Sequence, residues 1–536
     1  MLARFWNSKS GNFAMMLGVS LPVILAGAGM AIDYATMSKA KAVIQSATDA
    51  AVLAASRIND DSVSRKAVFD DFLAANLLNE PTLANVVGTI EIEEGRTSIR
   101  SVGRVTADVK LHFPFIFGTG HKVSAEASAY ESTANLEIAL ALDNTGSMGA
   151  YRMGELRKAA TALLDILESV HKPNGSPKRV VKAALVPFVT AVNVKGTGFK
   201  RSWIDGIDAV DYETDTTTLS PLHGSDFDKR PDGRPYNHFA LFKRLGIEWK
   251  GCVQARPGAL ALSDEPPSKA RPETLFVPYF APDEPGIARA PGDKGDQWNN
   301  SYLNDMTGGP EAVVDVRKET ADELRARQKS VLKYATTTPK YIRNDHATVT
   351  AGPNYACPTP IVPLTDDFNR LRLEVSKLID WKGSGTNVSE GLAWAQRVLS
   401  PGEPYTEGAP FGAENTSKYV VVFTDGENQV FGASGEKINK SDYGAYGFFD
   451  TGRVAATRGA ALTTVNGWTL DVCTALKEKK VEIFTILLGA DTLANRTLYK
   501  ACATTPENYF PASDVSELDA VFKKIGSRIA KLHFTG

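Results

Sequence analysis

From Asn135 onward, short and mostly apolar runs alternate with segments of helical periodicity. Of all the sequence features, this alternation most strongly constrains the fold. Strands buried on both faces of a parallel sheet read as near-continuous hydrophobic runs, and strands that alternate with helices form such sheets. The pattern therefore predicts an α/β fold with a doubly wound, mostly parallel sheet covered by helices on both faces. The predicted strands are Leu136–Leu142, Val180–Val189, Ile361–Leu364, Tyr419–Phe423 and Val481–Leu488.

Segments of helical periodicity separate these strands. Residues 152–172, 368–378 and 518–532 each place apolar side chains on one helix face. Another helix is expected to begin at Asn387, where Glu390 three residues later is close to a capping box. One helix before and one helix after strand Val481–Leu488 complete the predicted α/β part.

Three short polar segments lie at strand ends or at a helix start: Asp143–Met148, Gly385–Asn387 and Thr424–Asn428. Ligands of such sheets bind outside the carboxyl ends of the strands, so we expect the three segments to meet there. Their hydroxyl and carboxylate oxygens are hard donors, which suit Mg²⁺, Mn²⁺ or Ca²⁺ and not zinc or copper. The candidate metal-binding residues are Asp143, Thr145, Ser147, Thr386 and Asp425.

The order of these segments resembles the metal-ion-dependent adhesion site (MIDAS) of the von Willebrand factor A domain. The first motif of that family is Asp-x-Ser-x-Ser, and here Thr145 takes the place of the first Ser. The resemblance implies that Thr145, Ser147 and Thr386 are direct or near-direct ligands. It also implies that Asp143 and Asp425 hold bound waters and balance the charge. Three unrelated polar turns are the alternative interpretation.

Neutral hydroxyl ligands would leave a bound cation with much of its charge. Mg²⁺ requires six-coordination and keeps waters where protein groups are missing, so we expect an open position that accepts a carboxylate from a partner. None of the candidate residues is a nucleophile or a general base, and the sequence therefore predicts a binding site without enzymatic activity. The alternatives are a structural scaffold that the metal stabilises and a metal-dependent hydrolase.

The N-terminal region contains the uncharged run Phe13–Ile32. About 20 such residues span the hydrocarbon core of a bilayer as a helix. Arg4 and Lys9 precede the run, which favours a short cytoplasmic N-terminus and an exported remainder. A cleaved signal peptide is the alternative, but the helical pattern continues to residue 56, so an uncleaved anchor is predicted. Asp33 is interpreted as marking the membrane boundary.

Beyond the anchor, the sequence predicts an Ala-rich helical stem over residues 33–56, a second helix over Ser64–Leu78 and a small antiparallel sheet. The strands of this sheet are expected at Val86–Glu93, Arg96–Ser101, Val105–Phe113 and Val123–Glu131. A helical stem followed by a small sheet is the plan of a pilin.

This region contains four short segments that are informative together: Gly11–Ala14, Leu21–Val23, Asp33–Tyr34 and Gln45–Ala51. In these segments the chain resembles the N-terminal part of TadG-like proteins of the Flp (tight-adherence) pilus system. Prepilin-type processing requires a Glu five residues after the cleaved Gly. After Gly11 that position is Met16, which argues against such processing.

Residues 194–358 lack the alternation of predicted strands and helices that marks the α/β part, and they are rich in Pro, Gly, Asp and aromatic residues. So long a stretch is improbable as a loop, and an inserted lobe is predicted. It follows a strand that should run parallel to the strand ending at Asp143, so we expect it to emerge beside the metal site. There it would wall the site or supply an acidic side chain to the open metal position.

The chain has four cysteines, none in the close spacing of zinc or thioredoxin sites. Three pairings are possible, and export favours disulfides over free thiols. We favour Cys473–Cys502, which would join the helices on either side of strand Val481–Leu488, and Cys252–Cys357, which would staple the lobe.

The TadG-like architecture joins the two resemblances in this order. The expected divisions are a cytoplasmic tail (1–12), a transmembrane anchor (13–32), the stem and pilin-like region (33–133), and an A domain (134–193 and 359–536) around the lobe (194–358). The resemblance implies a single-pass inner-membrane protein whose bulk is periplasmic or surface-exposed. Its expected partners are pilus or pseudopilin components or a surface ligand. The net charge of −2 gives no electrostatic reason to expect nucleic-acid binding.

Overall fold

The structure, a computed structural model, describes residues 10–56, 64–95, 98–113, 121–173, 179–214, 218–284, 300–303, 320–335, 351–383, 385–429, 439, 441–531 and 534–535. The chain forms two compact units. Unit 1 comprises residues 1–134, 173–178 and 531–536, and unit 2 comprises residues 135–172 and 179–530. Most of the predicted cytoplasmic tail and the first two residues of the strand predicted at Arg96–Ser101 lie outside the described residues.

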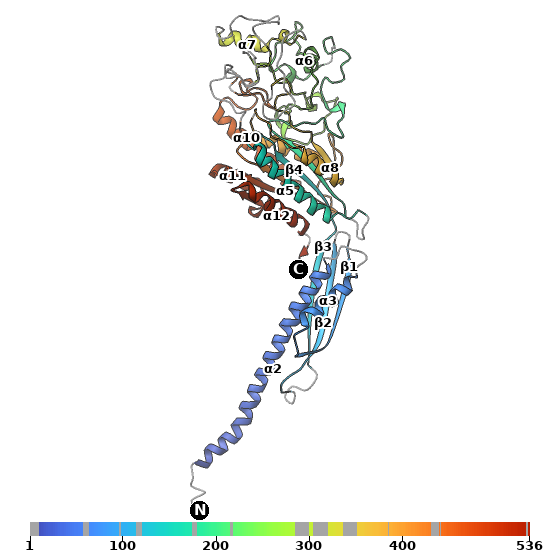
Figure 1. The fold of residues 1–536 in the computed structure, drawn as a ribbon, viewed down its shortest axis with the longest axis vertical. Coiled ribbons are helices and arrows are strands. Elements are labelled where there is room, and N and C mark those ends of the chain that lie inside the picture. Colours follow the sequence, from blue (N-terminus) through green and yellow to red (C-terminus); the bar gives the residue numbers. More distant parts are fainter. Residues whose placement is uncertain are drawn as a thin grey trace, which may run out of the picture. The chain divides into compact units, whose positions relative to one another are not determined.

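Unit 1 combines helices with a four-stranded antiparallel sheet of order β1-β2-β3-β10 (Figure 1). Its elements are α2 (Ser10–Ser56), α3 (Arg65–Leu77), β1 (Leu83–Glu94), β2 (Ser98–Val109), β3 (Lys122–Ser132) and β10 (Phe534–Thr535). The stem, the second helix and the small antiparallel sheet agree with the sequence prediction. Strand β10 was not predicted, because two residues are too few to show any periodicity.

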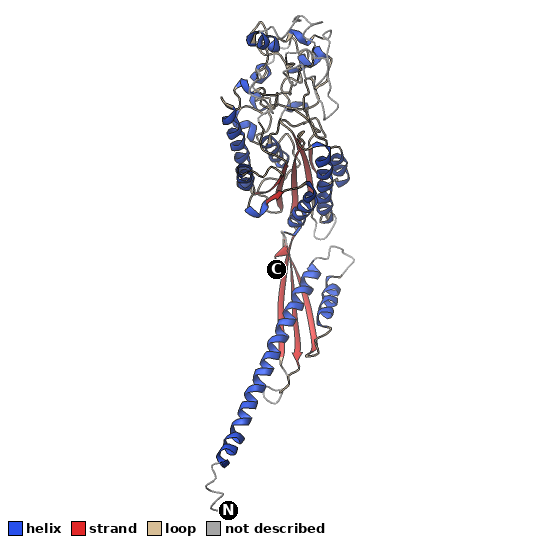
Figure 2. Ribbon diagram, turned by 60° about the vertical axis from the view of Figure 1, so that its left-hand side comes forward, coloured by secondary structure: helices blue, strands red, loops and turns tan. Residues whose placement is uncertain are grey.

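The first part of helix α2 extends beyond the sheet of unit 1, and its later part runs beside that sheet (Figure 2). Apolar side chains in its first part, such as Met15, Val19 and Val23, are largely exposed. From Ala40 onward, apolar residues at helical spacing are buried in the core of unit 1. Among the described residues, α2 is the one helix long and apolar enough to cross a membrane, judged by length and composition over Met15–Ser56.

Strand β2 corrects the sequence prediction, which divided it into two strands and extended it to Phe113. The predicted break contains Gly103. A Cβ atom at this position would lie 2.3 Å from Val52 Cγ2 and 2.8 Å from Phe69 Cε2. Glycine inside a strand often marks the close approach of another element, and here α2 and α3 pack directly on the strand. The glycine thus permits helix-on-sheet packing and does not interrupt the strand.

Asp33 is fully buried in unit 1, although the sequence suggested only a marker of the membrane boundary. Its Oδ1 accepts a hydrogen bond from the backbone N–H of His112 at 2.8 Å, and its Oδ2 accepts one from Phe113 N–H at 3.1 Å. The carboxylate therefore ties α2 to the chain that follows β2. Local sequence patterns do not reveal a contact between residues so far apart in the chain.

Unit 2 is built on a six-stranded sheet of order β6-β5-β4-β7-β8-β9. All neighbouring strands are parallel except the edge strand β6, which is antiparallel to β5. The strands are β4 (Asn135–Asp143), β5 (Val181–Phe188), β6 (Val362–Thr365), β7 (Thr416–Thr424), β8 (Val481–Leu488) and β9 (Tyr509–Ala512). The predicted fold class is confirmed. Strand β9 was not predicted, and it contains Pro511, which is tolerated because β9 forms an edge of the sheet.

Helices cover both faces of this sheet (Figure 1). Helices α5 (Gly149–Ser169), α8 (Phe368–Ser376) and α12 (Leu518–Lys531) share one hydrophobic core with it, and α9 (Val388–Leu399), α10 (Arg458–Glu478) and α11 (Leu493–Cys502) share the other. Asn387 caps α9 by accepting a hydrogen bond from Glu390 N–H at 3.2 Å. The Glu390 side chain bonds the Trp394 indole instead of the cap, so only half of a capping box forms.

The chain between β5 and β6 forms a lobe, called the lobe below, whose described helices include α6 (His238–Leu245) and α7 (Ala321–Lys329). Aromatic packing joins it to the α/β part, because the Phe276 ring lies 4.8 Å from the Trp394 ring of α9. Residues 441–457, which follow β7, pack with the lobe: Ala255 N–H donates to the Ala445 carbonyl at 2.9 Å. Two separate insertions therefore build this region.

Candidate metal centre

The candidate site lies where the strand order of the unit 2 sheet reverses. If the six strands β4 to β9 are numbered 1 to 6 in chain order, their order across the sheet is 3-2-1-4-5-6. The order reverses between strands 1 and 4, which are β4 and β7. The loops after such strands diverge to opposite faces and leave a crevice, where ligands of doubly wound sheets bind. Asp143 ends β4 and Thr424 ends β7, so the first and third polar segments predicted from the sequence meet at this crevice.

Asp143 is fully buried, and hydrogen bonds fix both of its carboxylate oxygens. Its Oδ1 accepts from the backbone N–H of Thr145 at 2.8 Å. Its Oδ2 accepts from the Thr424 hydroxyl at 2.7 Å. The side chain of the last residue of β7 therefore orients the carboxylate that ends β4.

A chain of hydroxyl contacts links Thr145 to Asp425. The Thr145 and Ser147 hydroxyl oxygens lie 2.9 Å apart, and Ser147 Oγ donates to Asp425 Oδ1 at 2.8 Å. The structure thus brings Asp143, Thr145, Ser147 and Asp425 together through direct hydrogen bonds.

Arg152, in the first turns of α5, pairs with the other oxygen of Asp425. Its Nη1 donates to Asp425 Oδ2 at 3.0 Å. The Asp425 side chain is 1% exposed and the Arg152 side chain is 45% exposed. The arginine therefore reaches from solvent to a buried carboxylate, and partial solvation weakens the pair.

Thr386 is buried beside the other two loops and is held there by its backbone. Its carbonyl accepts from Gln429 N–H at 2.9 Å, and the next turn is anchored by Val388 N–H, which donates to Asn428 Oδ1 at 2.8 Å. At the other end of its loop, Trp381 N–H donates to the Asn144 carbonyl at 2.8 Å. Within the described part of the chain, the Thr386 hydroxyl makes no hydrogen bond to the other four candidate residues.

Electrostatics make the site favourable for a cation. Burial, and then the neighbouring charge of Asp425, raise the pKa of Asp143 to about 7. Burial also raises the pKa of Asp425, and Ser147 and Arg152 oppose that shift. Two carboxylates that repel each other in a desolvated crevice are stabilised by a proton or by a metal ion.

The donor set fits a hard divalent ion. No group of three or more His, Cys, Asp or Glu side chains occurs among the described residues, so hydroxyls must complete any ligand set here. The buried Asn144 Oδ1 has no hydrogen-bond partner among the described residues, although Asn144 Nδ2 donates to the Ile379 carbonyl at 3.0 Å. A buried acceptor without a partner is rare in folded proteins and is consistent with a polar species bound nearby.

The lobe lies against the Thr386 loop, as its attachment after the parallel strand β5 predicts. Lys250 Nζ lies 4.0 Å from the Trp381 ring centroid. A Cβ atom at Gly383 would lie 2.1 Å from the Tyr355 hydroxyl, and Gly383 has a positive φ of 98°. Glycine is therefore required there by both backbone conformation and contact with the lobe. That the lobe supplies an acidic metal ligand stays a prediction.

Both favoured cysteine pairs occur as disulfides in the structure. Cys252 and Cys357 join an inner segment of the lobe to its C-terminal end, with a Cα–Cα distance of 5.8 Å. Cys473 and Cys502 join α10 to α11, with a Cα–Cα distance of 5.2 Å. The Cys252–Cys357 bridge lies in the same hydrophobic cluster as Trp381. It therefore also stabilises the packing that supports the Thr386 loop.

Sequence reasoning missed three residues that shape the site. Thr424 and Asn144 enter the sequence predictions only as members of their segments, and Arg152 only as the start of a predicted helix. Thr424 orients Asp143, and Arg152 pairs with Asp425. The position of Arg152 at the start of a helix beside the crevice was a usable signal, because that helix begins at the first polar segment.

Comparison with protein families gives one match. Residues 11–57 match the Tad family, described as Flp pilus-assembly TadE/G-like. The match confirms the predicted resemblance for the N-terminal segment, and it lies almost wholly within α2. No curated protein matches the chain with significance.

Several solved structures resemble this chain. The pilus adhesin SpaC from Lactobacillus rhamnosus GG is 11% identical over 85% of this chain and 36% of its own, with a TM-score of 0.31. The von Willebrand factor domain of the type V pili tip protein Mfa5 from Porphyromonas gingivalis is 9% identical over 75% of this chain and 98% of its own, with a TM-score of 0.32. Proximal thread matrix protein 1 from the mussel byssus, with a zinc-occupied MIDAS motif, is 12% identical over 74% and 96%, with a TM-score of 0.19. This chain thus matches about a third of SpaC, and TM-scores this low carry no argument about function.

Proposed function

We propose that this chain is a membrane-anchored, non-enzymatic component of a Flp (tight-adherence) pilus assembly or adhesion system, and that it binds a protein partner through a divalent cation. Mg²⁺, or Mn²⁺ or Ca²⁺ in its place, would be held by Asp143, Thr145, Ser147, Thr386 and Asp425. The observation that carries this proposal is the buried pair Asp143 and Asp425, linked to two hydroxyls at the crevice of a doubly wound sheet.

The charge of the site favours an acidic group on the partner. Asp143, Asp425 and Arg152 together carry one negative charge when both carboxylates are ionised. A divalent cation would leave the centre with one positive charge in surroundings that screen it poorly. A carboxylate from a pilus or pseudopilin component, or from a surface ligand, is the group that such a centre would attract.

The hydrogen bonds of the two carboxylates hold both side chains in place for a cation. Both oxygens of Asp143 accept hydrogen bonds from the protein, and so do both oxygens of Asp425. Each oxygen keeps a second acceptor position, which is available to a cation or to water bound to it.

Helix α2 supports the proposed localisation. Its exposed apolar first part, its match to a pilus-assembly family and the preceding Arg4 and Lys9 favour a single inner-membrane span with the remainder exported. The rest of unit 1 and unit 2 would then lie in the periplasm or at the surface, where the two disulfides are stable.

A pull-down from envelope extract tests this proposal. The full chain in detergent micelles serves as bait in Mg²⁺ and in EDTA, beside Thr386→Ala and the matched control Thr463→Ala, an exposed threonine of α10. We expect one partner to be captured by the wild type and the control in Mg²⁺, and by no bait in EDTA or by Thr386→Ala. Equal capture in every condition would contradict a cation-mediated contact.

The same variants separate the proposal from its two alternatives. A structural scaffold predicts that Asp143→Ala abolishes the stabilisation by Mg²⁺ in thermal melts but leaves partner capture intact. A hydrolase predicts turnover of a phosphoester or peptide substrate that Asp143→Ala abolishes.

A further inference from the structure

We propose that a clamp positions the Asp425 carboxylate and thereby sets a preference of the metal centre for Mg²⁺ over Ca²⁺. The clamp consists of the Tyr499 side chain and the Cys473–Cys502 disulfide. It lies outside the five candidate metal-binding residues and acts on one of them. Its role depends on the cation site proposed above, because it determines which cation that site selects.

Helices α10 and α11 hold the loop that contains Asp425. On α11, the Tyr499 hydroxyl donates to the Gly426 carbonyl at 3.1 Å. On α10, the Thr469 hydroxyl oxygen accepts from Asn428 Nδ2 at 3.1 Å. Asp425 directly precedes the first of these contacts, so the position of its carboxylate depends on where both helices lie.

The disulfide joins these two helices close to both contacts. Residues three or four positions apart lie on one face of a helix. Cys473 follows Thr469 by four positions on α10. Cys502 follows Tyr499 by three positions on α11. The bridge therefore fixes the spacing between the two helix faces that hold the loop, and both cysteines are fully buried.

Tyr499 is fixed independently of the loop. Its side chain is buried in the same hydrophobic core as both cysteines of the bridge. Its backbone carbonyl accepts from the Thr485 hydroxyl of β8 at 2.9 Å. The Tyr499 hydroxyl is therefore a fixed point on the sheet and its helices, and the Gly426 carbonyl is tied to it.

A fixed loop favours Mg²⁺ because the two cations tolerate different geometries. Mg²⁺ requires near-ideal octahedral coordination at about 2.0–2.1 Å, whereas Ca²⁺ accepts flexible coordination at about 2.3–2.6 Å. The hydrogen bond from Ser147 to Asp425, at 2.8 Å, shows that the loops after β4 and β7 lie close together. Without the clamp the loop after β7 is free to move, which removes the geometry that Mg²⁺ needs but still permits Ca²⁺ binding.

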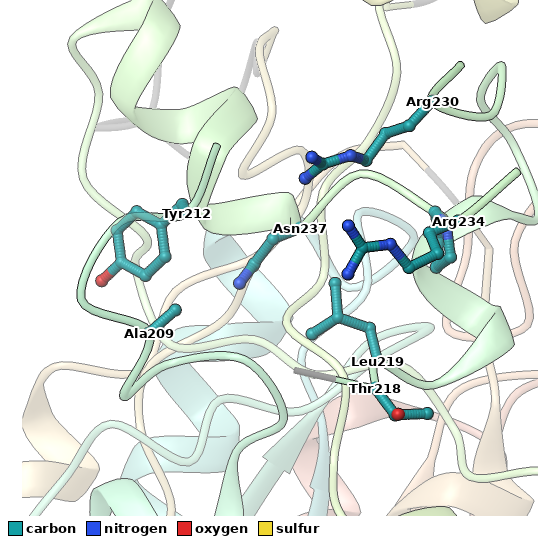
Figure 3. Close-up of a pocket in the computed structure, with 8 residues that line it drawn as sticks. Ala209, Tyr212, Thr218, Leu219, Arg230, Arg234 and Asn237 are labelled. Atoms are coloured by element: carbon teal, nitrogen blue, oxygen red, sulfur yellow. The ribbon is translucent and has the colours of Figure 1, made fainter. Parts of the chain in front are cut away.

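Calorimetric titrations of the full chain in detergent micelles, with Mg²⁺ and separately with Ca²⁺, test the clamp. The variants are Cys473→Ala combined with Cys502→Ala, Tyr499→Phe and the control Tyr212→Phe. The control removes the same group, because the Tyr212 hydroxyl also donates to a backbone carbonyl, that of Ile207, at 3.3 Å. Figure 3 shows Tyr212 at a pocket of the lobe, whose lining includes none of the five candidate metal-binding residues.

We expect the wild type to bind Mg²⁺ more tightly than Ca²⁺. The double cysteine variant should bind Mg²⁺ at least about tenfold more weakly than the wild type, and Ca²⁺ less than about threefold more weakly. Tyr499→Phe removes one hydrogen bond and should weaken Mg²⁺ binding about threefold to fivefold, with Ca²⁺ binding nearly unchanged. Tyr212→Phe should change neither affinity. Because partial unfolding would weaken both cations alike, the ratio of the two affinities separates positioning from a general loss of stability.

Hydrogen–deuterium exchange in the absence of any cation gives a second readout. The backbone N–H of Gln429 donates to the Thr386 carbonyl at 2.9 Å, so it reports whether the loop stays in place. It should exchange faster in the double cysteine variant and in Tyr499→Phe than in the wild type, and Tyr212→Phe should show the wild-type rate. An unchanged rate in both clamp variants would contradict a clamp on this loop.

Three titration results would overturn the proposal. An unchanged ratio of Mg²⁺ to Ca²⁺ affinity in both clamp variants would leave the metal centre intact but remove the role of the clamp. Ca²⁺ binding by the wild type as tight as that of Mg²⁺ would show that the site has no preference to set. No binding of either cation by the wild type would instead refute the metal centre itself. Because Tyr499→Phe removes a single oxygen atom, it keeps the test valid even if the double cysteine variant misfolds.

Discussion

Each unit of this protein buries an aspartate, and the surroundings of Asp33 in unit 1 and Asp143 in unit 2 differ in one respect. Asp33 receives two backbone N–H groups, and no second carboxylate is paired with it among the described residues. Asp143 receives a backbone N–H and a hydroxyl, but a second buried carboxylate, Asp425, lies close enough to raise its pKa.

The difference shows how a buried carboxylate can serve either structure or binding. Backbone donors alone are sufficient to hold a single buried charge, and the result is a tie between distant segments. Two carboxylates joined through hydroxyls remain electrostatically unfavourable until a proton or a cation arrives. The comparison therefore predicts that Asp33 stabilises unit 1 and that Asp143 serves a ligand.

The largest expected effect is the loss of cation binding in Asp143→Ala. Removing one of two charged groups from a buried site should weaken Mg²⁺ binding at least about hundredfold. Calorimetric titration with Mg²⁺ measures this, and Asp33→Ala is the control that should bind normally. Equal Mg²⁺ affinity in Asp143→Ala and the wild type would remove the distinction between the two aspartates.

The second effect is on the stability of unit 1. Asp33→Ala removes a buried carboxylate that accepts from two N–H groups, and it should lower the free energy of unfolding of unit 1 by about 2–3 kcal/mol. Hydrogen–deuterium exchange should show faster exchange at His112 and Phe113, with no change around β4 and β7. Exchange that stays slow at both amides would show that Asp33 does not hold this segment.

The third effect is a pH dependence of the stability and of the Mg²⁺ affinity of unit 2. Because the pKa of Asp143 is raised from 3.8 to about 7, the folded protein holds a proton that the unfolded chain has released. Without a cation, the stability of unit 2 should therefore fall as pH rises from about 4 to 7. A cation competes with that proton, so Mg²⁺ affinity should rise about tenfold from pH 6 to pH 8. Thermal melts and titrations across this range measure both trends, and a flat Mg²⁺ affinity would contradict them.

The smallest effect concerns Arg152, which has no counterpart beside Asp33. Arg152→Gln removes a positive charge paired with Asp425 and should tighten Mg²⁺ binding about threefold to fivefold, a modest change because the arginine is partly solvated. Arg157→Gln, on the same helix and bonded to the Leu378 carbonyl, should change nothing. Weaker Mg²⁺ binding in Arg152→Gln would mean that the arginine supports the site instead of competing with the cation.

The sequence predicted the sheet of unit 2 and the meeting of two polar loops, because a parallel sheet places the carboxyl ends of its strands at one edge. Apolar runs located β4, β7 and β8, and their ends located Asp143 and Asp425. The same rule placed the lobe beside the crevice, since β5 runs parallel to β4. These features follow from local patterns combined with a single rule of topology.

Contacts between distant segments were beyond such reasoning. The role of Asp33 depends on a turn about 80 residues away, and the apparent break at Gly103 depends on Val52 of another element. The pairing of Arg152 with Asp425 depends on how the loops after β4 and β7 fold onto one another. None of these leaves a periodic signal in the sequence.

The placement of unit 2 between strands β3 and β10 has a consequence for biosynthesis. The ribosome makes β1, β2 and β3 first, then the whole of unit 2, and only afterwards β10, which pairs with β3 at Glu131 and Tyr130. During translation, the outer edge of β3 therefore has open backbone groups for as long as it takes to make about 400 residues. The sheet of unit 1 is completed only once the whole of unit 2 has been translated, so the pairing of β10 with β3 is the last step in forming this sheet.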